Sequence, residues 1–230
     1  MALIQRDWEE ISRLVKGNYV EEKKNSPSTS SRRTVLQKAA SPETIQAELV
    51  EALSLSPHPT TPPVANISIW TSIMRGAGGF DITYTLSGAI EDVVFSVVAD
   101  PIRTDELWKT TCFEVFAKVK GDDSYIEYNF APSTKWAAYS FTAYREGMAD
   151  LAISAPPIIQ RNDADGRITF TVSAEIPAEW AAQDLLLNLT AVIEEMDGAK
   201  SYWALKHPDG PPDFHDPACI ILSLKAPDPA

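Results

Sequence analysis

Two alternating runs of residues, joined by a short turn, constrain the fold of this chain more than any other feature. In residues 112–119 and 125–130, apolar side chains recur at every second position, and Gly121-Asp122-Asp123 lies between the two runs. Alternation of period two on both sides of a Gly/Asp turn is typical of a β-hairpin. We therefore expect one face of each strand to point into a hydrophobic core.

The opposite face of this predicted hairpin is unusual, because it mixes polar and aromatic side chains. It carries two carboxylates and an amide, Glu114, Glu127 and Asn129, among Cys112, Phe116 and Tyr125. Such a mixture is consistent with a half-buried polar floor and equally with a ligand-binding surface. The residues alone leave both interpretations open.

The rest of the chain from residue 57 onward continues as short strand-like runs separated by turn residues. Besides the hairpin, we expect strands at 67–74, 80–86, 93–98, 137–144, 168–176, 185–195, 201–205 and 219–224. No long helical pattern lies between them, which disfavours a parallel α/β fold. Strands at this spacing predict an all-β, antiparallel β-sandwich of the jelly-roll or immunoglobulin-like kind.

The N-terminal part has a different character. Residues 3–16 show the apolar spacing of an amphipathic helix, with Ile4, Trp8, Ile11 and Val15 on one face. Residues 18–33 are polar and rich in serine, which is typical of a flexible linker. We expect a short helical extension that docks on the main domain or on a partner.

The charge distribution bears on possible partners. The chain has 32 acidic and 20 basic residues, for a net charge of −12. The first 40 residues carry a net charge of +3, so the remainder carries −15. A body of this charge repels phosphate backbones, so we expect no nucleic-acid partner.

Membrane and export signals are missing from the sequence. No run of about 18 apolar residues occurs, so we expect no transmembrane segment. The first residues lack the basic start, apolar run and cleavage site of a secretory signal, which favours a cytoplasmic location.

Enzyme motifs are equally scarce. The sequence has no Gly-rich phosphate loop, no Gly-x-Ser-x-Gly elbow and no His-Glu-x-x-His helix. Glu114 and Glu127 could act as a glycosidase acid and base, could bind Ca²⁺, or could form part of a buried polar layer. His207 and His215 share a proline-rich loop with several aspartates, but their spacing is not that of a known metal site. We favour a polar layer or ligand binding over catalysis, and we assign no catalytic or metal-binding residue.

Tryptophans are the other candidate ligand contacts. Trp108 and Trp203 lie at predicted strand ends next to polar residues, where an indole ring could stack on a sugar. The alternative is that they belong to the core, because burying an indole removes a large apolar area from water.

Four separate blocks of this sequence resemble the bacterial DOMON-like domain proteins, which are related in fold to family 9 carbohydrate-binding modules. The blocks are residues 105–116, 127–139, 144–148 and 201–215. The resemblance implies an antiparallel β-sandwich over residues 48–226, with 1–47 as an extension and 227–230 as a tail. In the wider superfamily, relatives bind sugars between tryptophans, or bind haem b through a methionine and a histidine or lysine.

Together these observations predict a non-catalytic ligand-binding domain with a small-molecule or glycan ligand, carbohydrate first. The expected ligand-binding residues are Trp108, Glu114, Glu127, Asn129, Tyr139, Arg145, Trp203, His207 and His215. One alternative is a haem b electron-transfer domain using Met74 or Met148 with His207, His215 or Lys206. The other is a protein-interaction module built on the N-terminal helix. No cofactor is required by the leading interpretation.

Overall fold

The computed structural model describes residues 32–36, 47–76 and 78–227, with side chains from Leu53 onward. The chain divides into two compact units, residues 1–30 and 31–230, and every described residue belongs to the second. The amphipathic helix predicted for residues 3–16 lies outside the described residues. None of the described helices has the length and hydrophobicity to span a membrane.

The described part is all-β and antiparallel, as predicted, and its only helices are single 3₁₀ turns. The strands are β1 (Arg32–Leu36), β2 (Ala47–Pro57), β3 (Ile67–Gly76), β4 (Gly79–Gly88), β5 (Cys112–Val119), β6 (Tyr125–Phe130), β7 (Trp136–Phe141), β8 (Ala149–Asp150), β9 (Ile158–Ala164), β10 (Arg167–Glu175), β11 (Leu185–Glu194), β12 (Lys200–Ala204) and β13 (Leu222–Leu224). The 3₁₀ turns are η1 (Ile90–Asp92), η2 (Leu107–Lys109), η3 (Ala178–Trp180) and η4 (Pro217–Cys219).

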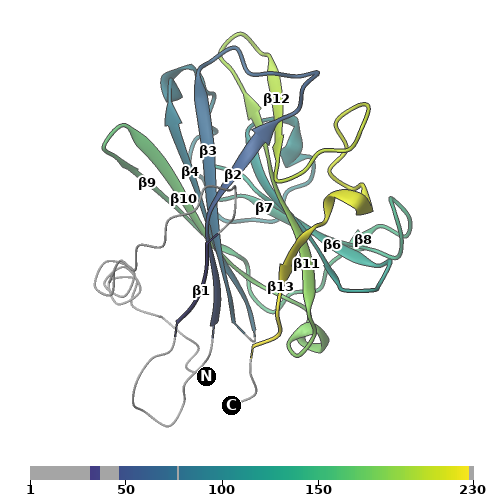
Figure 1. The fold of residues 1–230 in the computed structure, drawn as a ribbon. Coiled ribbons are helices and arrows are strands. Elements are labelled where there is room, and N and C mark those ends of the chain that lie inside the picture. Colours follow the sequence, from purple (N-terminus) through teal and green to yellow (C-terminus); the bar gives the residue numbers. More distant parts are fainter. Residues whose placement is uncertain (1–31, 37–46, 77, 228–230) are drawn as a thin grey trace, which may run out of the picture. The chain divides into compact units, whose positions relative to one another are not determined.

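All thirteen strands belong to one continuous sheet, which curls so that its two halves face each other (Figure 1). The β5 half has the strand order β8-β7-β6-β5-β11-β12, and β13 adds to β11. The β3 half has the order β2-β3-β4-β10-β9, and β1 adds to β2. The halves are joined where β12 pairs with β2, through Trp203 opposite Pro57 and Ala204 opposite Ser56.

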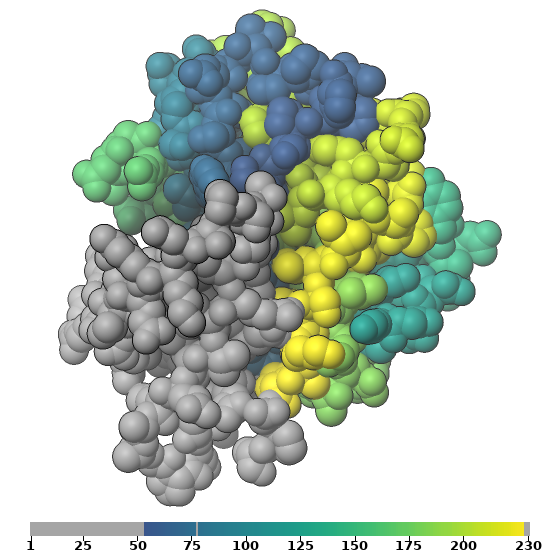
Figure 2. Space-filling model, viewed as in Figure 1, coloured from purple at the N-terminus to yellow at the C-terminus, as the bar shows by residue number. Residues whose placement is uncertain are grey.

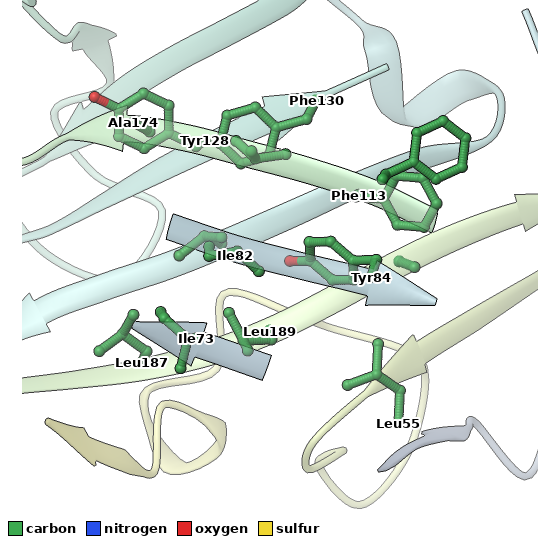
Figure 3. Close-up of a cluster of buried hydrophobic side chains, with 14 of the residues drawn as sticks. Leu55, Ile73, Ile82, Tyr84, Phe113, Tyr128, Phe130, Ala174, Leu187 and Leu189 are labelled. Atoms are coloured by element: carbon green, nitrogen blue, oxygen red, sulfur yellow. The ribbon is translucent and has the colours of Figure 1, made fainter. Parts of the chain in front are cut away.

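The main core fills the space between the two halves (Figure 3). The β3 half contributes Leu55, Ile69, Ile73, Ile82, Tyr84 and Phe170, and the β5 half contributes Phe113, Val115, Tyr128, Phe130, Leu187 and Leu189. The Tyr84 hydroxyl donates to the backbone oxygen of Glu114 at 2.9 Å, which satisfies its polar end inside the core and ties the two halves together.

The two halves differ in how their outer faces are covered. β3 and β4 alternate between buried and partly exposed residues, which indicates one solvated face. All of β6 and the first six residues of β5 are buried, so these strands are covered on both faces. A second apolar cluster accounts for this: it includes Phe116, Tyr125, Phe141 and Val192 under Phe214 of the C-terminal loop.

Arg75, at the end of β3, is a fully buried cation between the two halves. Its guanidinium donates to the backbone oxygens of Leu224 at 3.1 Å and Lys225 at 2.8 Å, next to β13. It also donates to those of Trp180 at 3.0 Å and Gln183 at 2.6 Å, in and after η3. One side chain therefore ties three segments together.

Several predicted elements need correction. Residues 93–98 are not a strand, and Val93 forms only an isolated bridge with Glu195. Cys219 lies in η4, so the last strand begins at Leu222 rather than at residue 219. Residues 32–36 form β1, within the segment that we expected to be extension and linker. The domain boundaries inferred from the family resemblance stay a prediction.

Candidate ligand-binding site

The predicted hairpin forms the floor of the candidate site. β5 and β6 pair with Glu114 opposite Asn129 and Phe116 opposite Glu127, around a turn in which Gly121 has a φ of 100°. Phe113, Val115, Ile126, Tyr128 and Phe130 belong to the main core, so the face with Glu114, Glu127 and Asn129 points away from it, as predicted. These polar side chains therefore lie on the outer face of the β5 half.

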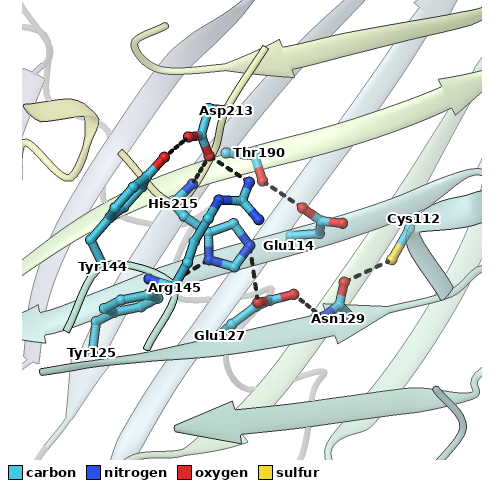
Figure 4. Close-up of polar contacts among 10 residues, drawn as sticks. All are labelled: Cys112, Glu114, Tyr125, Glu127, Asn129, Tyr144, Arg145, Thr190, Asp213 and His215. Carbon is cyan, nitrogen blue, oxygen red and sulfur yellow. Dashed lines mark hydrogen bonds and ion pairs between the residues drawn. The ribbon is translucent and has the colours of Figure 1, made fainter. Parts of the chain in front are cut away.

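Hydrogen bonds hold the floor residues in place (Figure 4). The Asn129 amide donates to Oε1 of Glu127 at 2.6 Å, and the Cys112 thiol donates to Oδ1 of Asn129 at 3.7 Å. On the neighbouring strand β11, the Thr190 hydroxyl donates to Oε2 of Glu114 at 3.3 Å. The polar floor is thus built by three adjacent strands.

The C-terminal loop covers one side of this floor with His215. The Tyr125 hydroxyl accepts from the backbone N–H of Arg145 at 3.2 Å and lies 2.8 Å from Nδ1 of His215. We assign the ring proton of His215 to Nε2, which faces Oε2 of Glu127 at 3.6 Å. Figure 2 shows the C-terminal segment, in yellow, on the surface next to the yellow-green and teal segments.

A clasp of three side chains joins two loops above the floor. Asp213 accepts from the Tyr144 hydroxyl, from Nη2 of Arg145 at 2.8 Å and from the backbone N–H of His215 at 3.0 Å. Arg145 has a φ of 55°, so the turn after β7 adopts a left-handed conformation at this residue. The clasp fixes Arg145 at the rim and neutralises its charge.

Burial sets the protonation of the floor. It raises the pKa of Glu114 well above the usual range, and the charge of Glu127 raises it further, against the hydrogen bond from Thr190. Burial also raises the pKa of Glu127 to about 7, although the Asn129 hydrogen bond and Arg145 oppose this. The pKa of His215 falls to about 4, because of burial and then of Arg145. Although His215 and Glu127 are close enough for an ion pair, His215 is therefore held neutral.

A cavity of about 350 Å³ opens above these residues. Its polar lining consists of Glu114, Glu127, Arg145, Asp213 and His215, and its apolar and aromatic lining of Trp108, Phe116, Phe141, Met148, Val192, Tyr202, Pro212 and Phe214. A concave site with a few convergent polar groups among aromatic walls is the usual form of a small-ligand site.

Seven of the nine predicted site residues lie in or beside this cavity. Trp108, Glu114, Glu127, Arg145 and His215 line it. Asn129 is buried behind Glu127 and positions its carboxylate. Tyr139 is buried, donates to Oδ1 of Asp105 at 2.7 Å and packs edge-on against Trp108. These last two residues support the lining and do not form it.

The structure places Trp203 and His207 elsewhere. Trp203 is 3% exposed within the main core, and its indole N–H donates to Ser201, so it has no face to offer a ligand. Alternation along β12 explains this, because Tyr202, the neighbouring residue, points to the cavity instead. His207 lies 2.8 Å from the backbone oxygen of Ser56 and packs edge-on against His58.

The sequence pattern did not indicate several of the lining residues. Tyr202 could have been found by assigning the faces of β12 from its alternation. Asp213 and Phe214 lie in the loop that was singled out, but nothing in the sequence marks which of its residues turn inward.

The residues considered as ligands of a metal ion or of haem can also be located in the structure. Within residues 53–76 and 78–227, no group of three or more His, Cys, Asp or Glu side chains is arranged to hold a metal ion. Met148 and His215 both line the cavity, but both ring nitrogens of His215 face protein groups, Tyr125 and Glu127.

Comparisons with known proteins add a likeness of fold. No protein-family model and no curated protein sequence matches the chain. The structure is similar to the crystal structure of a "putative carbohydrate-binding protein" from Bacteroides uniformis, with a TM-score of 0.56 at 14% sequence identity. The match covers 77% of this chain and 84% of that one. At this identity the likeness concerns the fold.

Proposed function

We propose that the chain is a non-catalytic carbohydrate-binding domain that takes its ligand in the cavity above β5 and β6. The observation that carries this proposal is the pairing of an aromatic platform with buried polar groups in one cavity. Trp108 is 37% exposed at the lining, and Glu114 and Glu127 are almost fully buried in it. Aromatic faces suit the apolar side of a sugar ring, and carboxylates suit its hydroxyl groups.

The likeness in fold to a protein named for carbohydrate binding is consistent with this proposal. We further infer that the chain is a DOMON-like domain with the two-layered sandwich of family 9 carbohydrate-binding modules. The curled sheet, with two halves facing each other across one core, supports that inference. Of the two tryptophans predicted to contact a glycan, Trp108 is exposed at the cavity and Trp203 is buried in the main core, so the proposed stacking surface is that of Trp108.

Trp108→Ala is expected to weaken carbohydrate binding by about 10-fold or more, because it removes the stacking surface of a contact residue. A glycan array would identify the best oligosaccharide, and titration calorimetry would then measure the dissociation constants of the wild-type protein and the variant.

Trp70→Ala is the matched control. Trp70 is 47% exposed on β3, in the other half of the sheet and outside the cavity lining, so its loss should leave the dissociation constant unchanged. An array without a binding glycan, or equal effects of the two substitutions, would contradict the proposed function.

A further inference from the structure

The acidic and basic side chains around the cavity are unevenly paired. At the rim, Arg145 and Asp213 neutralise each other through a 2.8 Å contact. On the floor, Glu114 and Glu127 are 2% and 5% exposed. In the part of the chain that the structure describes, neither forms an ion pair with a lysine or arginine. The floor therefore holds two acidic groups without a cationic partner.

The groups that surround the two carboxyls supply no unpaired positive charge. Thr190, which donates to Glu114, and Asn129, which donates to Glu127, are neutral. The titratable neighbours from the packed elements are Cys112 on β5, Tyr84 on β4, Tyr125 on β6, Tyr139 on β7, and Arg145, Asp213 and His215 in the loops. Burial raises the pKa of the Cys112 thiol and of the Tyr84 hydroxyl and lowers that of His215, so all three are uncharged near neutral pH.

Glu114 also has unused hydrogen-bonding capacity toward the cavity. Its side chain lines the cavity, and within residues 53–76 and 78–227 its carboxyl accepts one side-chain hydrogen bond, from Thr190 to Oε2. A carboxylate accepts several hydrogen bonds, so Oε1 remains available to a donor that enters the cavity. A donor that carries positive charge would satisfy this oxygen and the charge together.

The aromatic walls of the cavity also favour a ligand that carries positive charge. Trp108, Phe116, Phe141, Tyr202 and Phe214 line the cavity. The faces of aromatic rings attract ammonium groups, and the attraction is stronger where water is excluded. The net charge of −12 over the whole chain also favours the approach of a cation.

We propose that this cavity selects ligands with a protonated amine, so that its carbohydrate is an amino sugar whose ammonium group contacts Glu114 and Glu127. This inference rests on the proposed function, because it names the class of sugar that the same cavity takes. Burial raises the pKa of both carboxyls, so they hold protons more readily than exposed acids, and an ammonium group beside them would lower their pKa and favour their ionisation.

Two oligosaccharides that differ at each sugar only in whether the nitrogen is a free amine or an acetylated, uncharged amide would test the proposal. These are a glucosamine tetramer and the N-acetylglucosamine tetramer, titrated calorimetrically into the full-length protein at pH 6.0. We expect the amine form to bind at least 10-fold more tightly. Equal affinity, tighter binding of the acetylated form, or no binding of the amine form would overturn the inference.

Glu114→Gln separates recognition of an ammonium group from nonspecific binding, because glutamine keeps the shape and an acceptor oxygen but cannot ionise. It should weaken binding of the glucosamine tetramer at least 10-fold. Glu91→Gln, at an exposed position on η1, should have no effect. If both substitutions act equally, a diffuse attraction to an acidic surface explains the binding and the inference fails.

The two proposals can fail separately. Binding of a neutral sugar that depends on Trp108 and not on Glu114 would overturn the amine inference and keep the carbohydrate proposal. If the protein binds spermidine in a way that depends on Glu114 but binds no oligosaccharide, the carbohydrate proposal is overturned and the selection of amines by the cavity is kept.

Discussion

Glu114→Gln is expected to make the protein more stable, by an amount that grows with pH. Glu114 is buried on the floor, and burial together with Glu127 raises its pKa well above that of an unfolded chain. Above the unfolded pKa, the folded protein must either hold a proton that the unfolded chain has lost or keep an unpaired charge out of water. Glutamine avoids both costs.

The direction in which stability changes with pH follows from the number of protons that the folded and unfolded states bind. Where the folded state binds more protons than the unfolded state, the free energy of unfolding falls as the pH rises. The contribution of Glu114 is therefore fully present below the unfolded pKa of about 4.3 and is lost as the pH rises toward the raised folded value. We expect Glu114→Gln to match wild type near pH 4 and to exceed it by about 2 kcal/mol at pH 8, the order of the penalty for burying such a group.

Urea unfolding of both proteins at pH 4.5, 6 and 8 would measure this difference, with Glu91→Gln as an exposed control. The two proteins must be compared at the same pH, because the titrations of Glu127 and His215 change the free energy of unfolding in opposite directions. Glu127 has a folded pKa of about 7, above its unfolded value, so its titration lowers stability as the pH rises toward 7. His215 has a folded pKa of about 4, below its unfolded value of about 6.5, so its titration raises stability between these two pH values. A constant or shrinking advantage for Glu114→Gln would show that Glu114 is compensated in the folded state.

Arg75→Leu is expected to destabilise the protein on the order of 4 kcal/mol. The guanidinium of Arg75 satisfies backbone oxygens of Trp180, Gln183, Leu224 and Lys225, and leucine would leave them without a donor in a buried place. The measurement is the free energy of unfolding in urea, followed by tryptophan fluorescence.

Arg167→Leu is the matched control for this change. Arg167 is exposed at the start of β10, so its replacement should shift the free energy of unfolding by no more than about 0.5 kcal/mol. A loss below about 1 kcal/mol in Arg75→Leu would mean that the carbonyls find other donors and that Arg75 does not hold the segments together.

Strands were predictable where burial imposes a pattern. The expected bounds of 112–119 and 125–130 coincide with β5 and β6, because alternation is strict where one face fills the main core. β9 was missed, because at the edge of the sheet it is polar and largely exposed, so no alternation is required of it. The opposite error occurred at 93–98, an apolar run with Val97 87% exposed that pairs only at one bridge.

The floor of the site was predictable for the same reason, and its cover was not. Glu114, Glu127 and Asn129 stand out in the sequence because carboxylates and an amide interrupt an apolar pattern. Their partners Thr190 and His215 reach them from β11 and from the C-terminal loop, about 75–90 positions away in the chain. Such placement depends on the packing of the whole domain and leaves no local trace.

The alternation at Tyr202 and Trp203 makes the turn before β12 a determinant of the site. Tyr202 belongs to the cavity and Trp203 to the core, one residue apart on a strand whose register with β11 is fixed from Thr190–Ala204 to Glu194–Lys200. An insertion or deletion of one residue at 195–199 that shifts the register of β12 by one position would turn Tyr202 into the core and Trp203 toward the cavity. Homologous chains that keep this cavity should therefore tolerate substitutions in that turn far better than changes in its length.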